Sequence, residues 1–134
     1  AETFADMYYK EIRSFTTDSR KIAANLGKEE SDIRRIKAYL FEEESLVDPD
    51  TGERRQFDPD CAIAQSWQRL MIGKDIKPHD RTLIEHELLE MRIKQENPGI
   101  AHVKAHELAS EKYDYPKEVL EYYGNLKKHN KGKG

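Results

Sequence analysis

The sequence predicts a mainly helical protein, a compact bundle of about five to six helices with one short β-hairpin near residues 46–57. Two observations favour this class. Apolar residues recur every three or four positions in several stretches, which is typical of amphipathic helices that bury one face. Turn-forming residues flanked by short apolar segments near residues 46–57 favour a single hairpin. The 134 residues are enough for one domain with a modest core.

The first thirty residues predict two short helices. In residues 2–13 the apolar side chains have helical spacing (Phe4, Met7, Tyr8 and Ile12). A second short helix is expected over Lys21–Leu26, and Gly27 would end it because glycine readily adopts the left-handed conformation found after helices. We interpret residues 1–30 as an N-terminal helical extension or the remnant of a linker, and residues 31–134 as a single helical domain with a basic C-terminal tail.

The centre of the chain predicts two helices separated by the hairpin. The first helix starts at Ser31, and its apolar positions share one face (Ile33, Ile36, Leu40 and Phe41). Asp48–Gly52 is a strong turn signal, because its proline fixes φ and its glycine tolerates positive φ. Asp58 and Pro59 predict the cap and the first residue of the second helix, which is expected to end at Gly73.

The last third of the chain predicts three more helices. The pattern Thr82-x-x-Glu85 is a capping box, so one helix is expected to start there and to run to about Glu96. Asn97-Pro98-Gly99 would stop that helix and turn the chain. The next helix would cover about Ile100–Tyr113, and Pro116 would open the final one.

Two pairs of polar residues are placed so that they could meet across this turn. His86 and Glu90 are four residues apart, and so are His102 and His106, so each pair shares one face of its helix. The turn at residues 97–99 would fold these two faces toward each other. The helix around His86 is apolar on almost every side, so we expect Glu90 to be at least partly buried. A buried carboxylate is costly unless it is paired or bound to a metal.

Imidazole and carboxylate groups in this arrangement predict a metal centre. The candidate ligands are His86, Glu90, His102 and His106, and the candidate ions are zinc, manganese and magnesium. Three protein ligands leave a position for water, which is the arrangement of a catalytic site. The candidate catalytic residues are Glu87, as the base that acts on that water, together with His86 and His106.

Other interpretations of the same residues stay open. The motif His-Glu-x-x-Glu lacks the second histidine of the common zinc-protease helix. The cluster could perform acid–base or phosphate chemistry without a metal, or it could be a buried polar network that only joins two helices. Lys74, Lys77 and His79 precede the helix that carries the motif, and they form a weak candidate for binding an anionic substrate.

Composition excludes several classes of protein. The net charge of −3 gives no overall attraction to nucleic acid or to a membrane surface. No stretch is apolar enough to predict a transmembrane helix or a signal peptide. Cys61 is the single cysteine, so an internal disulfide is excluded. The chain starts at Ala1 without a methionine, which we interpret as the start of a piece cut from a longer protein.

Four segments resemble a C-terminal domain found in bacterial polymorphic toxins and in phage head-associated proteins. They are IKAYLF (36–41), FDPDCAIAQSWQRL (57–70), GKDIKPHDRTLIEHELLEMRI (73–93) and AHVKAHELASEKYDY (101–115). The polar positions of that pattern are matched by His86, Glu87, Glu90, His102 and His106. The resemblance implies an antibacterial effector carried by a longer secreted or phage-borne protein. Such an effector would act in the cytoplasm of the target cell and would be neutralised by a cognate immunity protein.

The resemblance implies that the domain is a nuclease or, less often, a peptidase. Together with the His/Glu cluster itself, this gives three hypotheses. The favoured one is a metal-dependent hydrolase that acts on the phosphodiester of nucleic acid. The second is a zincin-like metallopeptidase. The third is a non-enzymatic helical interaction module in which the His/Glu cluster is structural.

Overall fold

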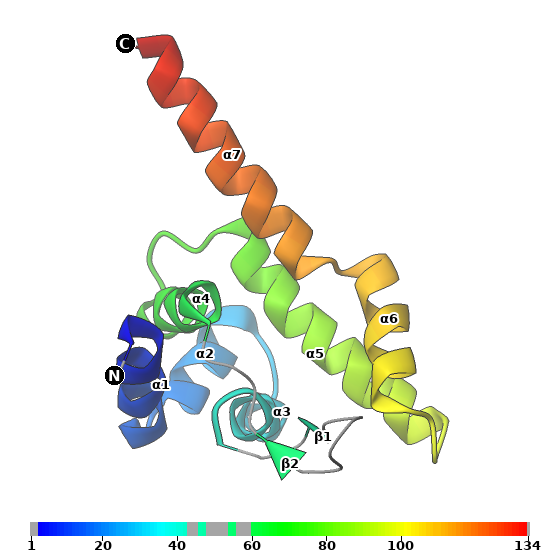
Figure 1. The fold of residues 1–134 in the computed structure, drawn as a ribbon. Coiled ribbons are helices and arrows are strands. Elements are labelled where there is room, and N and C mark those ends of the chain that lie inside the picture. Colours follow the sequence, from blue (N-terminus) through cyan, green and yellow to red (C-terminus); the bar gives the residue numbers. More distant parts are fainter. Residues whose placement is uncertain (1–2, 43–45, 48–53, 56–59, 134) are drawn as a thin grey trace. The chain divides into compact units, whose positions relative to one another are not determined.

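The computed structural model describes residues 3–42, 46–47, 54–55 and 60–133, and the chain divides into two compact units, Ala1–Ile76 and Lys77–Gly134 (Figure 1). The described part contains seven α-helices. The mainly helical class is therefore confirmed, although the expected number of about five to six helices was too low.

The first unit contains four α-helices and a π-helical turn. They are α1 (Phe4–Ser14), α2 (Asp18–Leu26), α3 (Glu30–Lys37), the turn η1 (Ala38–Glu42) and α4 (Cys61–Ile72). Their largest fully buried side chains include Ile12, Ile22, Ile36, Phe41 and Trp67. The expected boundary near residue 30 falls between α2 and α3, which pack against each other.

Local sequence features account for the ends of these helices. Thr3 caps α1, and its hydroxyl accepts a hydrogen bond from the Asp6 backbone N–H at 3.1 Å. Gly27 ends α2 in the left-handed conformation, with φ of 65°. Asp60 caps α4, because its side chain accepts from the Ala62 N–H at 2.8 Å. The cap that we expected at Asp58, and Pro59 beside it, lie outside the described residues.

Two short strands pair in this unit. These are β1 (Leu46–Val47) and β2 (Arg54–Arg55), which run antiparallel with Leu46 opposite Arg55. The turn expected at residues 48–52 lies outside the described residues.

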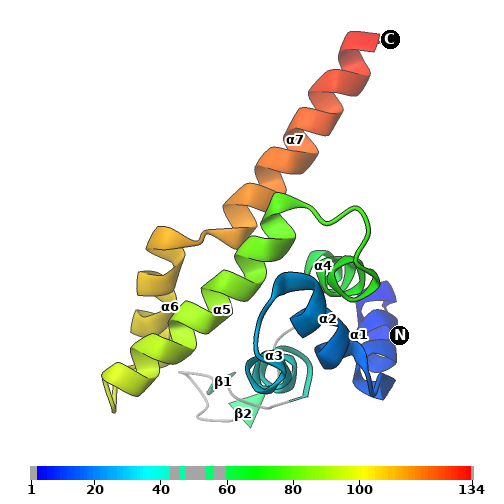
Figure 2. The same cartoon turned by 180° about the vertical axis from the view of Figure 1, so that it is seen from behind.

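The second unit consists of three helices, with α5 (Pro78–Glu96) in contact with both α6 (His102–Lys112) and α7 (Tyr115–Lys133). Figures 1 and 2 show α6 beside the C-terminal half of α5, and α7 starting beside its N-terminal half. The chain reverses between α5 and α6 at Gly99, where φ is 88°. Ala105 and Ala109 of α6 are fully buried, and such small side chains allow two helices to approach closely.

The start of α5 differs from the prediction. The helix begins at Pro78, and the Asp80 carboxylate caps it by accepting from the Lys77 backbone N–H at 2.8 Å. Proline is favourable at the first helical position, so this start prevails over the capping pattern at Thr82. The Thr82 hydroxyl instead donates to Glu118 Oε1 at 2.8 Å and so links α5 to α7.

The final helix is longer than expected, because α7 continues to Lys133 through the segment predicted as a basic tail. None of the helices in the described part of the chain combines the length and apolar character needed to cross a lipid bilayer.

Candidate metal centre

Three predicted ligands meet between α5 and α6. His86 and Glu90 come from α5, and His106 comes from α6. One ligand atom of each residue lies within 4.8 Å of the other two, so the three residues could hold a metal ion. The spacing of four residues places His86 and Glu90 on one face of α5, and the reversal at residues 97–100 brings α6 back alongside that face. We refer to His86, Glu90 and His106 as the ligand triad.

The ligand atoms of the triad face one another directly. His86 Nε2 lies 3.1 Å from Glu90 Oε2 and 3.2 Å from His106 Nδ1. His106 Nδ1 lies 3.6 Å from Glu90 Oε2. Two imidazole nitrogens and one carboxylate oxygen are a common ligand set for zinc, and they leave a position for water.

The backbone of Tyr113 fixes the proton position on His86. His86 Nδ1 lies 3.0 Å from the Tyr113 carbonyl oxygen, which can only accept, so Nδ1 carries a proton. In the neutral ring, Nε2 then has a lone pair that faces the carboxylate of Glu90. Two lone pairs in contact require a proton or a cation between them. Histidines that bind metal commonly donate their second N–H to a backbone carbonyl in the same way.

Glu90 is the most buried member of the triad and has an incomplete hydrogen-bond shell. Its side chain is 2% exposed, and Oε1 accepts no hydrogen bond from the described residues. His102 Nδ1 and Lys94 Nζ lie 3.3 and 3.5 Å from Oε1, close enough for charge interaction but without hydrogen-bond geometry. A buried carboxylate in this condition is destabilising unless a cation balances it, so the site fits a divalent ion.

Electrostatic interactions keep Glu90 ionised. Burial alone would raise its pKa, but interactions with His106 and His86 and the charge of Lys94 outweigh burial and lower the pKa. His86 shows the opposite balance. Burial would lower its pKa, but the hydrogen bond to Glu90 and the charge of Glu87 raise it. The neighbouring Glu90 and Glu87 therefore raise the pKa of His86 and favour its protonated form when no metal is bound.

Glu87 is buried next to the triad but is not one of its three converging ligands. Burial, with a further contribution from the charge of Glu90, raises the pKa of Glu87 to about 7. The nearby His86 and His106 act in the opposite direction and limit the rise. A carboxyl group with a pKa near neutrality can both accept and release a proton at physiological pH, which suits a general base.

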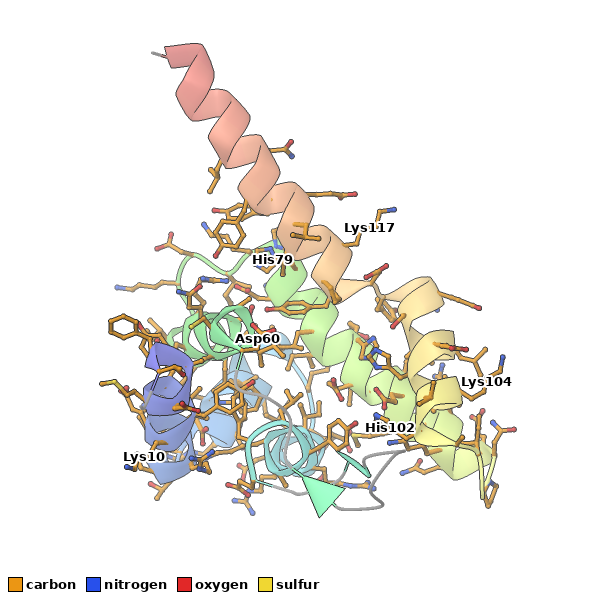
Figure 3. All side chains as sticks on the ribbon, in the orientation of Figure 1. Lys10, Asp60, His79, His102, Lys104 and Lys117 are labelled. Atoms are coloured by element: carbon orange, nitrogen blue, oxygen red, sulfur yellow. The ribbon has the colours of Figure 1, made fainter. Side chains whose placement is uncertain are left out.

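His102, the fourth predicted ligand, lies beside the triad. Its Nδ1 accepts a hydrogen bond from Lys94 Nζ at 3.0 Å, and its ring stacks on His106 with centroids 6.2 Å apart. Figure 3 shows His102 on the side of α6 that faces α5. Burial and the charge of Lys94 lower the pKa of His102. His102 therefore lies near the Oε1 oxygen of Glu90, whereas His86 lies near Oε2.

Two of the three predicted substrate-binding residues lie near the start of α5. His79 is buried near the start of α5, with its ring 5.1 Å from that of Tyr122 on α7. Lys77 Nζ lies 5.6 Å from the centroid of the same tyrosine ring. His79 precedes His86 by seven residues, which is about 10 Å along the helix. Lys74 belongs to the first unit.

Sequence reasoning did not identify two contributors to the site. Lys94 is four residues after Glu90 on α5, so the helical spacing that relates His86 to Glu90 could have indicated it. The Tyr113 carbonyl is a backbone group at the end of α6 and has no residue-specific signal.

Comparisons of this chain with protein-family models, with curated proteins and with solved structures found no match.

Proposed function

We propose that this protein is a divalent-metal-dependent hydrolase whose ion is bound by the ligand triad. The observation that carries the proposal is the convergence of His86 Nε2, Glu90 Oε2 and His106 Nδ1, which lie 3.1 to 3.6 Å from one another, while His86 Nδ1 donates to the Tyr113 carbonyl. Two imidazoles suit zinc or manganese better than magnesium, which prefers oxygen ligands.

A bound ion of this kind supplies an activated water molecule and polarises the bond to be broken. Glu87 is the residue that accepts a proton from the attacking water, because its pKa of about 7 leaves much of it ionised at neutral pH. The water oxygen forms a bond to the substrate while the bond to the leaving group breaks. Glu87 then returns its proton to the leaving group, so the reaction consumes one water and restores the site.

Two substrate classes fit this hydrolytic centre. The resemblance to toxin domains supports a phosphodiester of nucleic acid, cleaved in the cytoplasm of a target cell in the absence of an immunity protein. The second class is a peptide bond. It is favoured by the ligand set of two histidines and one glutamate, with Glu87 directly after the first histidine, as in zinc peptidases.

Titration of the metal-free chain with zinc tests the centre. We expect one equivalent of zinc to bind, and His86→Ala and His106→Ala to weaken binding about 100-fold or more, since each removes one of three ligands. Glu96→Gln is the matched control, because Glu96 is an exposed carboxylate on the same helix. Stoichiometric zinc binding that survives both histidine substitutions would reject the assignment of the ligands, and failure of the wild type to bind would reject the centre.

Expression of the chain in bacterial cells tests the activity. We expect growth arrest with degradation of DNA or RNA, and Glu87→Gln should abolish both while zinc still binds. General-base catalysis contributes about 10²–10⁴-fold, so the residual activity of this variant should be small. Degradation of cellular protein with intact nucleic acid would favour the peptidase. Full activity of Glu87→Gln would reject the role of this residue.

A further inference from the structure

We propose that Lys94 is the anion-binding residue of this centre, that its ammonium group occupies the position of a second cation, and that the substrate is therefore a phosphate ester. The inference depends on the proposed metal-dependent function and identifies its substrate class. The zincin-like alternative does not call for this lysine, because a peptide bond has no anionic oxygen for it to bind.

The position of Lys94 links the buried triad to solvent. Lys94 follows Glu90 by one helical turn on α5, and its Nζ lies 3.5 Å from Glu90 Oε1 and 3.0 Å from His102 Nδ1. Its side chain is 36% exposed, whereas that of Glu90 is 2% exposed. The Lys94 side chain therefore reaches from the buried carboxylate of Glu90 to the solvent-exposed surface of α5.

The two oxygens of Glu90 face two different sets of groups. Oε2 faces His86 and His106, which are the proposed metal ligands. Oε1 faces Lys94 and His102, and the three atoms involved form a triangle with sides of 3.0, 3.3 and 3.5 Å. With an ion on the ligand triad, Glu90 would therefore have a positive charge near each of its two oxygens, the second being the Lys94 ammonium group.

A fixed positive charge is needed at this second position. His102 Nδ1 accepts from Lys94, so it presents a lone pair to Glu90 Oε1, and both atoms are electron-rich. The ammonium group of Lys94 relieves that repulsion. The lysine thus provides the positive charge that a second metal ion would provide in a binuclear site.

The accessible part of the cluster is suited to an anion. The side chains of Lys94, His102 and His106 are 36%, 28% and 50% exposed. The two carboxylates of the cluster, Glu87 and Glu90, are buried. An incoming group therefore meets a positive charge and imidazoles before it meets a carboxylate. A lysine binds phosphate oxygens as a point charge, whereas a peptide bond has no anionic oxygen to pair with it.

Inorganic phosphate is the probe for this inference. The full chain is loaded with cobalt(II) as a spectroscopic substitute for zinc, and phosphate binding is followed by the change in visible absorption and by calorimetry. Phosphate should bind to the wild type, and Lys94→Gln should weaken it about tenfold or more, because one charge-assisted hydrogen bond is lost. Cobalt affinity should stay within about threefold, since Lys94 is not a ligand of the metal.

Two further variants keep the experiment decisive. Lys94→Arg retains the charge and should bind phosphate more tightly than Lys94→Gln, which would exclude a merely structural effect. Lys104→Gln is the matched control, because Lys104 is an exposed lysine of α6 that points away from α5 (Figure 3).

The outcomes separate this inference from the proposed function. Equal phosphate affinity in wild type and Lys94→Gln, or no phosphate binding by the loaded wild type, would overturn the inference alone. Failure of the wild type to bind cobalt or zinc would overturn the proposed function and the inference with it.

Discussion

Each unit of the molecule buries a carboxylate beside a lysine, but the two carboxylates differ in how fully their oxygens are hydrogen-bonded. In the first unit, Asp18 accepts hydrogen bonds from Lys37 Nζ at 3.0 Å and from Trp67 Nε1 at 2.9 Å, and Lys37 is itself buried. In the second unit, Glu90 contacts imidazoles and a partly exposed lysine, and Oε1 accepts no hydrogen bond from the described residues. A complete network stabilises a fold, whereas an incomplete network that reaches solvent leaves room for a ligand.

The largest expected effect is a loss of stability when the Asp18 network of the first unit is broken. Lys37→Met removes the ammonium group that pairs with Asp18 and leaves a buried carboxylate without a cationic partner among the described residues. We expect a loss of about 3–5 kcal/mol in the free energy of unfolding. Denaturant unfolding followed by the fluorescence of Trp67, the single tryptophan, measures it. Lys21→Met, at an exposed position of α2, is the control, and a loss similar to the control would show that the network is dispensable.

The next effect tests the incomplete network. Zinc at 100 times its dissociation constant should stabilise the folded chain by about 2.7 kcal/mol, because the unfolded chain has no preformed site. His106→Ala should cost the metal-free protein less than about 1 kcal/mol, since half of this side chain is exposed, but it should remove the stabilisation by zinc. Thermal unfolding with zinc and with a chelator measures both. A large loss of stability in His106→Ala without metal would show that His106 has a structural role.

A smaller effect concerns pH in the metal-free protein. Burial raises the pKa of Glu87 to about 7 from its ordinary value of 4.5, so around neutral pH the folded state holds a proton that the unfolded chain releases. Stability should therefore fall by about 2 kcal/mol as pH rises from 5 to 8. The raised pKa of His86 acts in the same direction. Glu90, with its lowered pKa, contributes stability that is lost only in acid.

Glu87→Gln isolates that effect. The variant should show a weaker decline between pH 5 and 8, and Glu96→Gln should behave like the wild type. Unfolding free energies measured in the presence of a chelator provide the comparison. A decline that is equally steep in Glu87→Gln would assign the pH dependence to other groups.

The helical class and the approach of α5 to α6 were predictable from the sequence. Helical spacing placed His86 and Glu90 on one face, and Asn97-Pro98-Gly99 marked the reversal that brings His106 to them. These inferences succeeded because they depend on periodicity and on a strong turn signal.

Other features could not be predicted, because they depend on which of two possible helix starts is used or on backbone atoms that every residue possesses. Thr82-x-x-Glu85 has the form of a capping box, but Pro78 and Asp80 provide an earlier start to the same helix. His102 is the first residue of α6, so its ring reaches Glu90 Oε1 beside Lys94 rather than joining the triad. The Tyr113 carbonyl orients His86 through an atom that every residue possesses.

The reversal after α5 keeps the residues of the proposed centre close together in the sequence. Because α5 and α6 are joined by a tight turn, every group that contacts the proposed ion or the incoming anion lies within residues 86–113. One short stretch of the gene therefore encodes the described residues of the proposed centre. A recombination event that exchanges this stretch would transfer or remove the proposed chemistry in a single step, while the buried network around Asp18 would be inherited separately.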